Sequence, residues 1–315
     1  MKVFHGVTEA RELAGCSLAL GNFDGVHVGH QALFAEARRQ GTLTAALTFQ
    51  PHPGKVLQPE LAPKLISVLP RKLELFEDCG LDAAVVQPFT REYARHSPAD
   101  FEASLLDVLG ARHIVVGYDF TYGAARAGTA DTLREAAAAR GAQVHVVPPV
   151  TVDGVVASSS KVREYILEGR VSAAQRLLGR PFDLDGTVVT GHGRGRGIGF
   201  PTANVDTQNE LRPAAGVYAI RVRFLGASGS TPDAPDATWL PGVANIGVKP
   251  TFGVNEVTIE AHLLDFSGDL YGRELRVQFL ERLRAERRFG SVAELVGQIK
   301  RDVEAARAVI ARASG

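Results

Sequence analysis

The feature that most constrains the fold is a change of pattern along the chain. From residue 17 to about 150, short β-prone runs alternate with amphipathic helical stretches. After about residue 184, β-prone runs follow one another, separated by Gly, Pro, Asn and Asp. Strand–helix alternation is typical of a parallel sheet with helices on both faces, whereas successive β-runs are typical of an antiparallel barrel or sandwich. The sequence therefore predicts two domains of different class, 1–183 and 184–315.

In the first domain we expect five sheet strands, at 17–21, 42–49, 82–87, 113–117 and 142–147. The helices between them have recognisable ends. QALFAEARRQ is closed by Gly41, and TADTLREAAAAR is stopped by Gly141. In SPADFEASLLDVLG, Ser97 is the expected N-cap, Pro98 the first helical residue and Gly110 the residue beyond the end.

In the second domain the β-prone runs are DGTVVTG, GVYAIRVRF, TWLPGVANIG, EVTIEAHLLDF and RELRVQFLERL. The segment 226–237, GASGSTPDAPDA, is rich in turn formers and is expected to be a loop. SVAELVGQIKRDVEAARAVIAR is predicted to form a terminal helix, with its apolar residues on one face. We therefore expect a small antiparallel barrel or sandwich with one helix packed on it.

Composition narrows the class of protein. Lys+Arg and Asp+Glu both number 35 in 315 residues, so net charge gives no reason to expect a nucleic-acid partner. Cys16 and Cys79 are the only cysteines, which fits a reducing compartment and excludes a zinc site built from cysteines. No apolar run approaches a signal-peptide core or the roughly 20 residues of a membrane span. We expect a cytoplasmic protein without a membrane partner.

The stretch GNFDGVHVGH contains the first candidate site. It follows the apolar run 18–20 and leads into the helix that continues through QALFAEARR. A helix start offers backbone N–H donors and a positive dipole end, both of which suit phosphate. Gly25 and Gly29 permit a ligand to approach closely, and His27 and His30 can offer further N–H donors from one face. The stretch is neither a G-x-G-x-x-G fingerprint nor a P-loop.

A second candidate site begins at a glycine-rich segment. Glycines at 191, 193, 195, 197 and 199 alternate around two arginines and can wrap backbone N–H groups around phosphate. A disordered nucleic-acid contact is the alternative, which the short length and the neutral net charge disfavour. The following FPTAN supplies the hydroxyl of Thr202 and the amide oxygen of Asn204, both hard ligands suited to Mg²⁺ beside phosphates. In an extended segment, their spacing places both on one face.

These motifs carry a family resemblance. GNFDGVHVGH resembles the signature of the nucleotidylyltransferase superfamily, in which H-x-G-H binds ATP phosphates. Over nearly its whole length the chain resembles the bacterial bifunctional riboflavin kinase/FAD synthetase family, through TFQPHP (48–53), IVVGYDFTYGAARAG (114–128), ASSSKVREYI (157–166) and the G-x-P-T-A-N stretch. Four positions depart from the family pattern: Tyr122 replaces Phe, Ala157 replaces Ile, Ser160 replaces Thr and Ile259 replaces Val.

The resemblance implies a Rossmann-like adenylyltransferase in the first domain. There, the FMN phosphate would attack the α-phosphorus of ATP and expel pyrophosphate, with His27 and His30 on the triphosphate. The other implied ATP- or phosphate-binding residues are Gly21, Asn22, Phe23, Asp24, Gly29, Ser159, Ser160 and Arg163. From the residues alone, SSSKVRE also fits an N-capped surface helix. The resemblance places Asp119 at the flavin, although a structural Asp at the sheet edge fits as well.

In the second domain the resemblance implies a riboflavin-kinase-type barrel. Gly191, Gly195, Gly199 and Pro201 would bind ATP, and Thr202 and Asn204 would hold Mg²⁺. Glu260 in TIEAHLLDF matches the catalytic base, which takes the proton of the ribityl hydroxyl; an exposed strand face is the alternative. His262 is expected on the Glu260 face and has no assigned role. Arg284, in RAERRFGSVAELVGQIKRD, is the candidate flavin contact.

The predicted function is therefore bifunctional: riboflavin to FMN, then FMN to FAD. ATP is the co-substrate of both steps, and riboflavin, FMN and FAD are substrates or products. Two other interpretations remain at this point. One is a nucleotidylyltransferase for another phosphorylated substrate, such as a pantetheine or a choline or glycerol phosphate. The other is a flavin- or nucleotide-binding regulator without activity. Association into a weak homo-oligomer is also left open.

Overall fold

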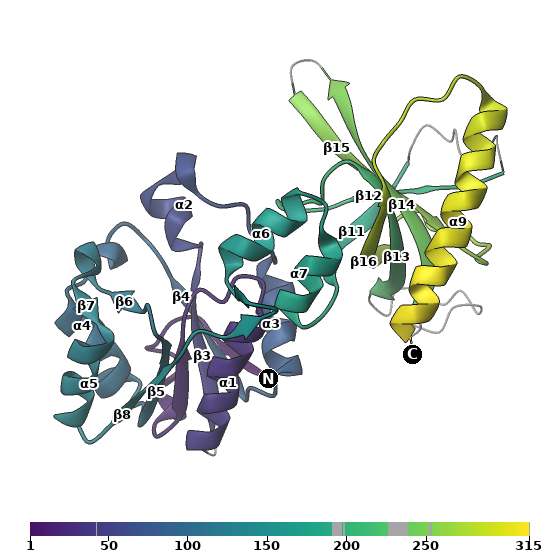
Figure 1. The fold of residues 1–315 in the computed structure, drawn as a ribbon. Helices are drawn as coiled ribbons and strands as arrows, with labels where there is room; N and C mark the ends of the chain where they lie inside the picture. The colour runs from purple at the N-terminus through teal and green to yellow at the C-terminus, as the bar shows by residue number, and fades with distance from the viewer. Residues whose placement is uncertain (42, 191–196, 198, 226–238, 252–253, 315) are drawn as a thin grey trace. The chain divides into compact units, whose positions relative to one another are not determined.

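The computed structural model describes residues 1–41, 43–190, 197, 199–225, 239–251 and 254–314. The chain divides into two compact units, Met1–Ser159 and Ser160–Gly315 (Figure 1). Within the described residues, no helix combines the length and the apolar character needed to cross a membrane.

The first unit is built on a parallel six-stranded sheet in the order β1-β4-β3-β2-β5-β8. Its strands are β1 (Lys2–Phe4), β2 (Ser17–Leu20), β3 (Thr44–Gln50), β4 (Ala83–Pro88), β5 (His113–Gly117) and β8 (Gln143–Val147). The chain runs from β2 outward through β3 to β4, and then returns to the other side of β2 for β5 and β8. Ligands of open α/β sheets bind at such a reversal, outside the carboxyl ends of the strands.

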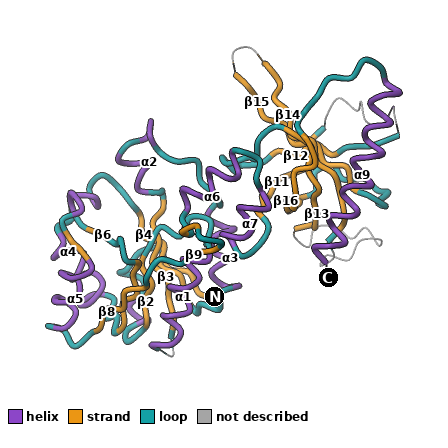
Figure 2. Tube along the Cα trace, viewed as in Figure 1, coloured by secondary structure: helices purple, strands orange, loops and turns teal. Residues whose placement is uncertain are grey.

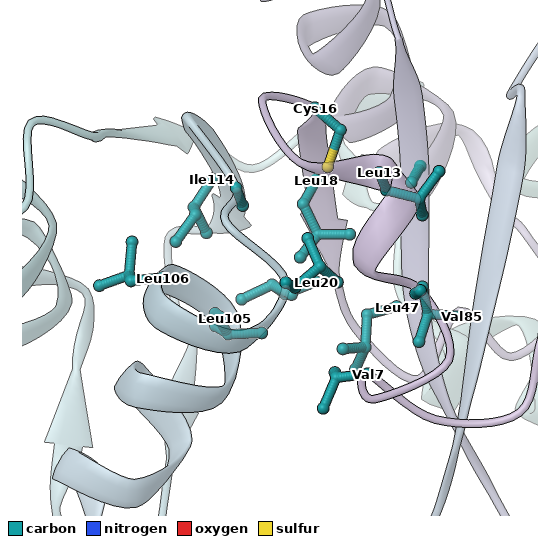
Figure 3. Packing of buried hydrophobic residues seen from close by; sticks show 14 of the residues in the cluster. Val7, Leu13, Cys16, Leu18, Leu20, Leu47, Val85, Leu105, Leu106 and Ile114 are labelled. Atoms are coloured by element: carbon teal, nitrogen blue, oxygen red, sulfur yellow. The ribbon is translucent and has the colours of Figure 1, made fainter.

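The helices of this unit cover both faces of the sheet, as predicted. They are α1 (Val28–Gln40), α2 (Pro53–Leu57), α3 (Leu69–Asp78), α4 (Pro98–Ala103) and α5 (Ala130–Ala138). One face packs Leu18, Leu20 and Leu47 against Leu105 and other buried side chains (Figure 3). The opposite face packs the alternate strand residues, such as Ala19, against α1 and α3. A strand buried on both faces reads as a continuous apolar run, which is why these strands were visible in the sequence.

All five predicted strands of the first sheet are present, and so are the three predicted helices. Ser97 caps α4 in a capping box with Asp100, and Gly110 and Gly141 both have positive φ. The predicted single helix over 97–110 instead changes to a π-helical turn at Ser104–Val108. The prediction missed β1, α2 and α3, and the short hairpins β6–β7 (Thr121–Tyr122, Gly128–Thr129) and β9–β10 (Thr151–Val152, Val155–Val156).

The second unit is a closed antiparallel barrel, which resolves the choice between barrel and sandwich. Its strand order is β11-β12-β15-β14-β13-β16, and β16 pairs back to β11 (Figure 2). The strands are β11 (Phe182–Val189), β12 (Ala203–Asp206), β13 (Gly216–Leu225), β14 (Leu240–Thr251), β15 (Val254–Leu263) and β16 (Glu274–Arg284). The expected terminal helix is α9 (Val292–Ser314), whose Ala306 and Val309 pack on Val217, Ala219 and Leu280 of the barrel.

Two helices precede the barrel, α6 (Ser159–Leu167) and α7 (Val171–Leu178). The backbone N–H of Ala214 donates to the carbonyl of Ile166, and α7 contacts β11 and β16. These contacts explain why the compact units divide after Ser159, earlier in the chain than the expected border at 183/184. The end of one catalytic module and the start of the next stay a prediction. The predicted loop 226–237 lies outside the described residues.

Candidate functional site

The first unit contains a cavity of about 840 Å³ at the carboxyl ends of the sheet strands. Gly21 follows β2, Phe49 lies near the end of β3, Gly117 ends β5 and Val147 ends β8, and all four line it. This is the position at which the strand order reverses. The volume lies in the range of pockets that enclose a cofactor-sized ligand.

The two predicted histidines belong to the lining of this pocket. His27 is the N-cap of α1, and its Nδ1 accepts a hydrogen bond from the backbone N–H of His30 at 3.4 Å. Their rings stack with centroids 3.6 Å apart and 24° between planes. An accepting Nδ1 places the proton of a neutral imidazole on Nε2. The backbone donor of His30 is already used by the cap.

His30 is held as a neutral imidazole. Burial lowers its pKa well below the ordinary value, and the charges of His27 and Lys72 lower it further. Its Nδ1 is buried and has no hydrogen-bond partner among the described residues. A phosphate placed against this pair would be met by N–H dipoles, which stabilise negative charge on its oxygens.

Small residues are required beside these rings. A Cβ on Gly29 would lie 3.0 Å from Nδ1 of His27 and 3.4 Å from the carbonyl oxygen of Ala157. Gly25 has φ +81°, and a Cβ there would lie 2.9 Å from Ile66. Both glycines therefore allow close packing inside the protein. Gly29 also lines the pocket, and its predicted close approach to a ligand stays a prediction.

A buried carboxylate ties the loop before α1 to the segment that precedes α3. The carboxylate of Asp24, 2% exposed, accepts the backbone N–H groups of Ile66 and Ser67 at 3.0–3.2 Å. Asn22 and Phe23 line the pocket, but Asp24 does not. Asp24 therefore supports the loop from the side away from the pocket.

Ser159 joins this loop to the second predicted phosphate element. Its Oγ donates to the carbonyl of Asp24 at 2.9 Å, and both Ser158 and Ser159 line the pocket. Ser160 and Arg163 lie in α6 and are counted with the second unit. Their role at the phosphate site stays a prediction.

A cluster of aromatic side chains forms another part of the pocket lining. Phe49, Phe89, Tyr93 and His96 line it in mutual contact, with successive ring centroids 4.7–6.0 Å apart. Burial raises the pKa of Tyr93 to about 12, and its buried hydroxyl has no partner among the described residues. Flat aromatic walls with a few polar groups suit a planar heteroaromatic ligand.

A second aromatic wall comes from the segment 114–128. The hydroxyl of Tyr122 donates to Glu102 at 2.6 Å, and a Cβ on Gly128 would lie 2.5 Å from the Tyr122 ring, so this ring is tightly fixed. Asp119 is an exposed residue of the pocket lining, and its expected place at the flavin stays a prediction. Arg126 also lines the pocket and was missed, although it lies inside the quoted motif.

The second site lies on the barrel, in a row of residues that face one another across strands. Asn204 of β12 is opposite Glu260 of β15, and Glu260 is opposite Asn245 of β14. Asn245 is in turn opposite Val217, which packs under α9. Since opposed residues share a face and α9 packs on the outside of the barrel, Asn204, Glu260 and Asn245 face outward together. Asn245 was not predicted, because its place opposite Glu260 depends on strand register.

The FPTAN segment is fixed against the same face. The Nδ1 of His262 donates to the carbonyl of Pro201 at 2.7 Å, and the His262 ring meets that of Phe200 edge-on. His262, left without a role by the sequence, therefore positions the backbone just before Thr202. Thr202 itself is exposed, immediately before β12.

The end of this row is closed by an ion pair. Arg284 is opposite Val217 and donates to both carboxylate oxygens of Asp302 in α9, at 2.8–3.1 Å. Its expected flavin contact stays a prediction. The carboxylate of Glu286 lies beside the outward face instead. Gly247 is two residues after Asn245 and therefore shares its face of β14, and a Cβ on Gly247 would lie 2.9 Å from Oε1 of Glu286.

Of the glycines assigned to ATP, Gly199 has φ +84°, a conformation that favours glycine. Gly191 and Gly195 lie outside the described residues. Among the residues that are described, no group of three or more His, Cys, Asp or Glu side chains could hold a metal alone. The oxygens of Thr202 and Asn204 fit a Mg²⁺ ion that takes its remaining ligands from phosphate and water.

Comparison with known proteins assigns each unit to a family. The family model described as FAD synthetase matches residues 9–161, and the model described as riboflavin kinase matches residues 178–310. A Pseudomonas fluorescens protein named bifunctional riboflavin kinase/FMN adenylyltransferase is 39% identical, covering 99% of this chain and 98% of its own. The Escherichia coli K12 protein of that name is 37% identical, covering 98% and 97%.

One solved structure is similar over nearly the whole chain. It is titled a macrolide-efflux protein from Streptococcus pneumoniae, and it is 31% identical with a TM-score of 0.86. The match covers 97% of this chain and 98% of that one. It supports the succession of a parallel-sheet unit and a barrel unit along one chain.

Proposed function

This chain belongs to the family of bifunctional riboflavin kinase/FMN adenylyltransferases, and from that premise we infer that it makes FMN from riboflavin and FAD from FMN. ATP supplies the phosphoryl group in the first reaction and the adenylyl group in the second. The match to FAD synthetase covers most of the parallel-sheet unit and ends in α6, and the match to riboflavin kinase begins at the end of α7 and covers the barrel. From the geometry of the two sites we propose which residues perform each reaction.

The observation that supports the FAD synthetase site is one pocket whose lining combines two chemically different groups of side chains. One group is the stacked pair His27 and His30, and the other is the cluster of rings around Tyr93. We place the triphosphate of ATP at the histidines and the isoalloxazine ring of FMN among the aromatic side chains. An oxygen of the FMN phosphate then attacks the α-phosphorus of ATP, and pyrophosphate leaves from the opposite side.

No covalent enzyme intermediate is needed in this reaction. The protein holds two anions in line and offers N–H dipoles to the charge that develops on the phosphoryl oxygens. His27 and His30 are donors in this scheme, which agrees with the lowered pKa of His30, because a neutral imidazole retains one N–H. Ser159 holds the loop through Asp24 and lies close enough to line the pocket.

On the barrel, Glu260 is our proposed general base. It takes the proton of the terminal ribityl hydroxyl while that oxygen attacks the γ-phosphorus of ATP, and ADP leaves. Thr202 and Asn204 would hold Mg²⁺, which neutralises phosphate charge when bound. Because Asn204 and Glu260 are directly opposed across two strands, phosphate and hydroxyl are brought to one place on the barrel.

The two sites are tested independently in one protein. His27→Ala should abolish FAD formation while FMN still accumulates from riboflavin and ATP. Glu260→Ala should lower FMN formation about a hundredfold or more, while FAD still forms from supplied FMN. If one substitution removed both activities from a folded chain, the assignment of two separate sites would be wrong. Absence of FMN and FAD in the wild-type reaction would favour the other substrates considered for a nucleotidylyltransferase.

Dependence on Mg²⁺ is tested in the same assays by chelation and by Asn204→Ala. Chelation should stop FMN formation, and Asn204→Ala should raise the Mg²⁺ concentration at half-maximal rate. A cytoplasmic location, independence of nucleic acid and the oligomeric state stay predictions from the sequence.

A further inference from the structure

A buried lysine contacts the loop that lines the first pocket with Asn22 and Phe23. Lys72 lies in the first turns of α3 and is 5% exposed. Its Nζ donates to the backbone carbonyl of Asn22 at 2.9 Å and lies 3.5 Å from Oγ1 of Thr48. Thr48, 0% exposed, donates its own hydroxyl to the same carbonyl at 3.0 Å. Two side chains from β3 and α3 thus hold one peptide group of the loop.

Burial of an ammonium group is costly unless its charge is balanced. Here burial lowers the pKa of Lys72, and the carboxylate of Asp24, itself 2% exposed, raises it. The neighbouring core contains Phe34, Phe76 and Leu75, so an apolar side chain would suit the surroundings. Packing alone therefore does not explain why a lysine occupies position 72.

The backbone conformation of the loop before α1 explains why Lys72 is needed. Phe23 has φ +50° and Val26 has φ +43°, a region that residues with a Cβ adopt at a cost of about 1–3 kcal/mol each. Such conformations persist only where the surroundings hold them. The peptide that Lys72 and Thr48 hold is the one immediately before Phe23, and Asn22 and Phe23 both line the pocket.

We propose that Lys72 is a positioning residue of the FAD synthetase site, which fixes the carbonyl of Asn22 so that the loop 21–25 keeps its phosphate-binding form, and which places a cation behind His30. The proposal rests on the assignment of this pocket to FAD synthesis. Lys72 does not line the pocket, so it acts through the loop and through its charge.

The charge of Lys72 gives a measurement that a purely structural lysine would not affect. Three causes lower the pKa of His30: burial, the charge of His27 on the adjoining ring, and the charge of Lys72 from α3. Asp24, in the loop, is the charged group that acts on Lys72. Without the ammonium, one of the three causes is lost and the pKa of His30 should rise.

The test compares Lys72→Met with Arg71→Met in the full chain. Arg71 is the matched control, because it lies in the same helix, is 7% exposed, and pairs with Glu74 at 2.9 Å on that helix. We would measure the rate of FAD formation from supplied FMN against ATP concentration, and riboflavin kinase activity in the same sample. His30 would be titrated by NMR of its ring C–H signal, identified by its loss in His30→Gln.

For Lys72→Met we expect kcat/KM for ATP in FAD formation to fall at least tenfold and the His30 titration to move to higher pH. Lys72→Arg, which keeps the charge, should restore the titration. Riboflavin kinase activity should stay within twofold, and Arg71→Met should change neither FAD formation nor the titration. FAD formation within twofold of wild type, the same loss in Arg71→Met, or an unmoved His30 titration would each overturn the proposal.

If Lys72→Met does not fold, Thr48→Val tests the same peptide anchor with a side chain of similar shape. FAD formation should then fall about fivefold with riboflavin kinase activity intact, and an unchanged rate would overturn the proposal. His27→Ala separates this outcome from failure of the site itself. If His27→Ala also left FAD formation intact, the assignment of the pocket would be wrong and not only the role of Lys72.

Discussion

Gly29→Ala adds one methyl group beside the ring that caps α1. The new Cβ would lie 3.0 Å from both Nδ1 and Cε1 of His27, closer than carbon normally approaches, with the carbonyl oxygen of Ala157 at 3.4 Å on another side. The backbone of Gly29 is helical, so alanine is compatible with the local conformation. The ring of His27 must therefore move, which weakens its hydrogen bond with the N–H of His30.

The expected effect on stability is small because two contributions oppose each other. Loss of an N-cap costs about 1 kcal/mol, and replacing a helical glycine by alanine gains up to about 1 kcal/mol. The effect on catalysis is not offset. Loss of one hydrogen bond to a charged phosphate is worth about 1.5–3 kcal/mol, which corresponds to a decrease of roughly 10- to 100-fold in the rate of FAD formation.

The assay measures FAD formed from supplied FMN and ATP, with FMN formation from riboflavin as the internal measure of folding. Gly15→Ala is a suitable control, since Gly15 has φ +88°, does not line the pocket and has open space around its Cβ position. It should lose about 1 kcal/mol of stability from the strained backbone and keep the rate of FAD formation. A folded Gly29→Ala protein with a rate within threefold of wild type would refute the role given to the His27 ring.

Two further predictions concern stability. Asp185→Asn removes a carboxylate charge from the side chain of Arg276, which is 0% exposed and donates two 2.6 Å hydrogen bonds to Asp185. The unfolding free energy of the barrel unit should fall by about 3 kcal/mol, measured as a lower urea midpoint for loss of riboflavin kinase activity; an unchanged midpoint would contradict it. The folded chain lowers the pKa of both His30 and His145, mainly through burial, below the ordinary value of 6.5. The neutral forms therefore stabilise the first unit above pH about 6.5, and stability falls as the pH drops below that value. Urea midpoints for loss of FAD synthesis at pH 7.5 and 5.5 should show this fall, and His145→Gln should make it smaller; equal midpoints in the wild type would show that neither histidine titrates as described.

The sequence was most informative where a pattern has one physical meaning. Both-face burial produced the apolar runs of the parallel sheet, and local capping chemistry placed the ends of α4 and α5 through Ser97 and Gly141. The helix α3 was missed because its buried Arg71 and Lys72 do not fit an apolar face. Their burial depends on partners far away in the chain, such as Asn22, which no local pattern records.

The sequence alone determined the chemistry that is available: a histidine pair at a helix start, an oxygen-bearing PTAN segment and a carboxylate in a β-run. It also determined the class of each domain, because hydrophobic periodicity is set by which faces are buried. Tertiary structure decided which of these groups meet. Strand register places Asn204 and Asn245 on either side of Glu260. Tertiary packing produces the hydrogen bond from His262 to Pro201 and the ion pair between Arg284 and Asp302. These pairings join residues far apart in the chain, so they result from packing and register, and no local spacing can specify them.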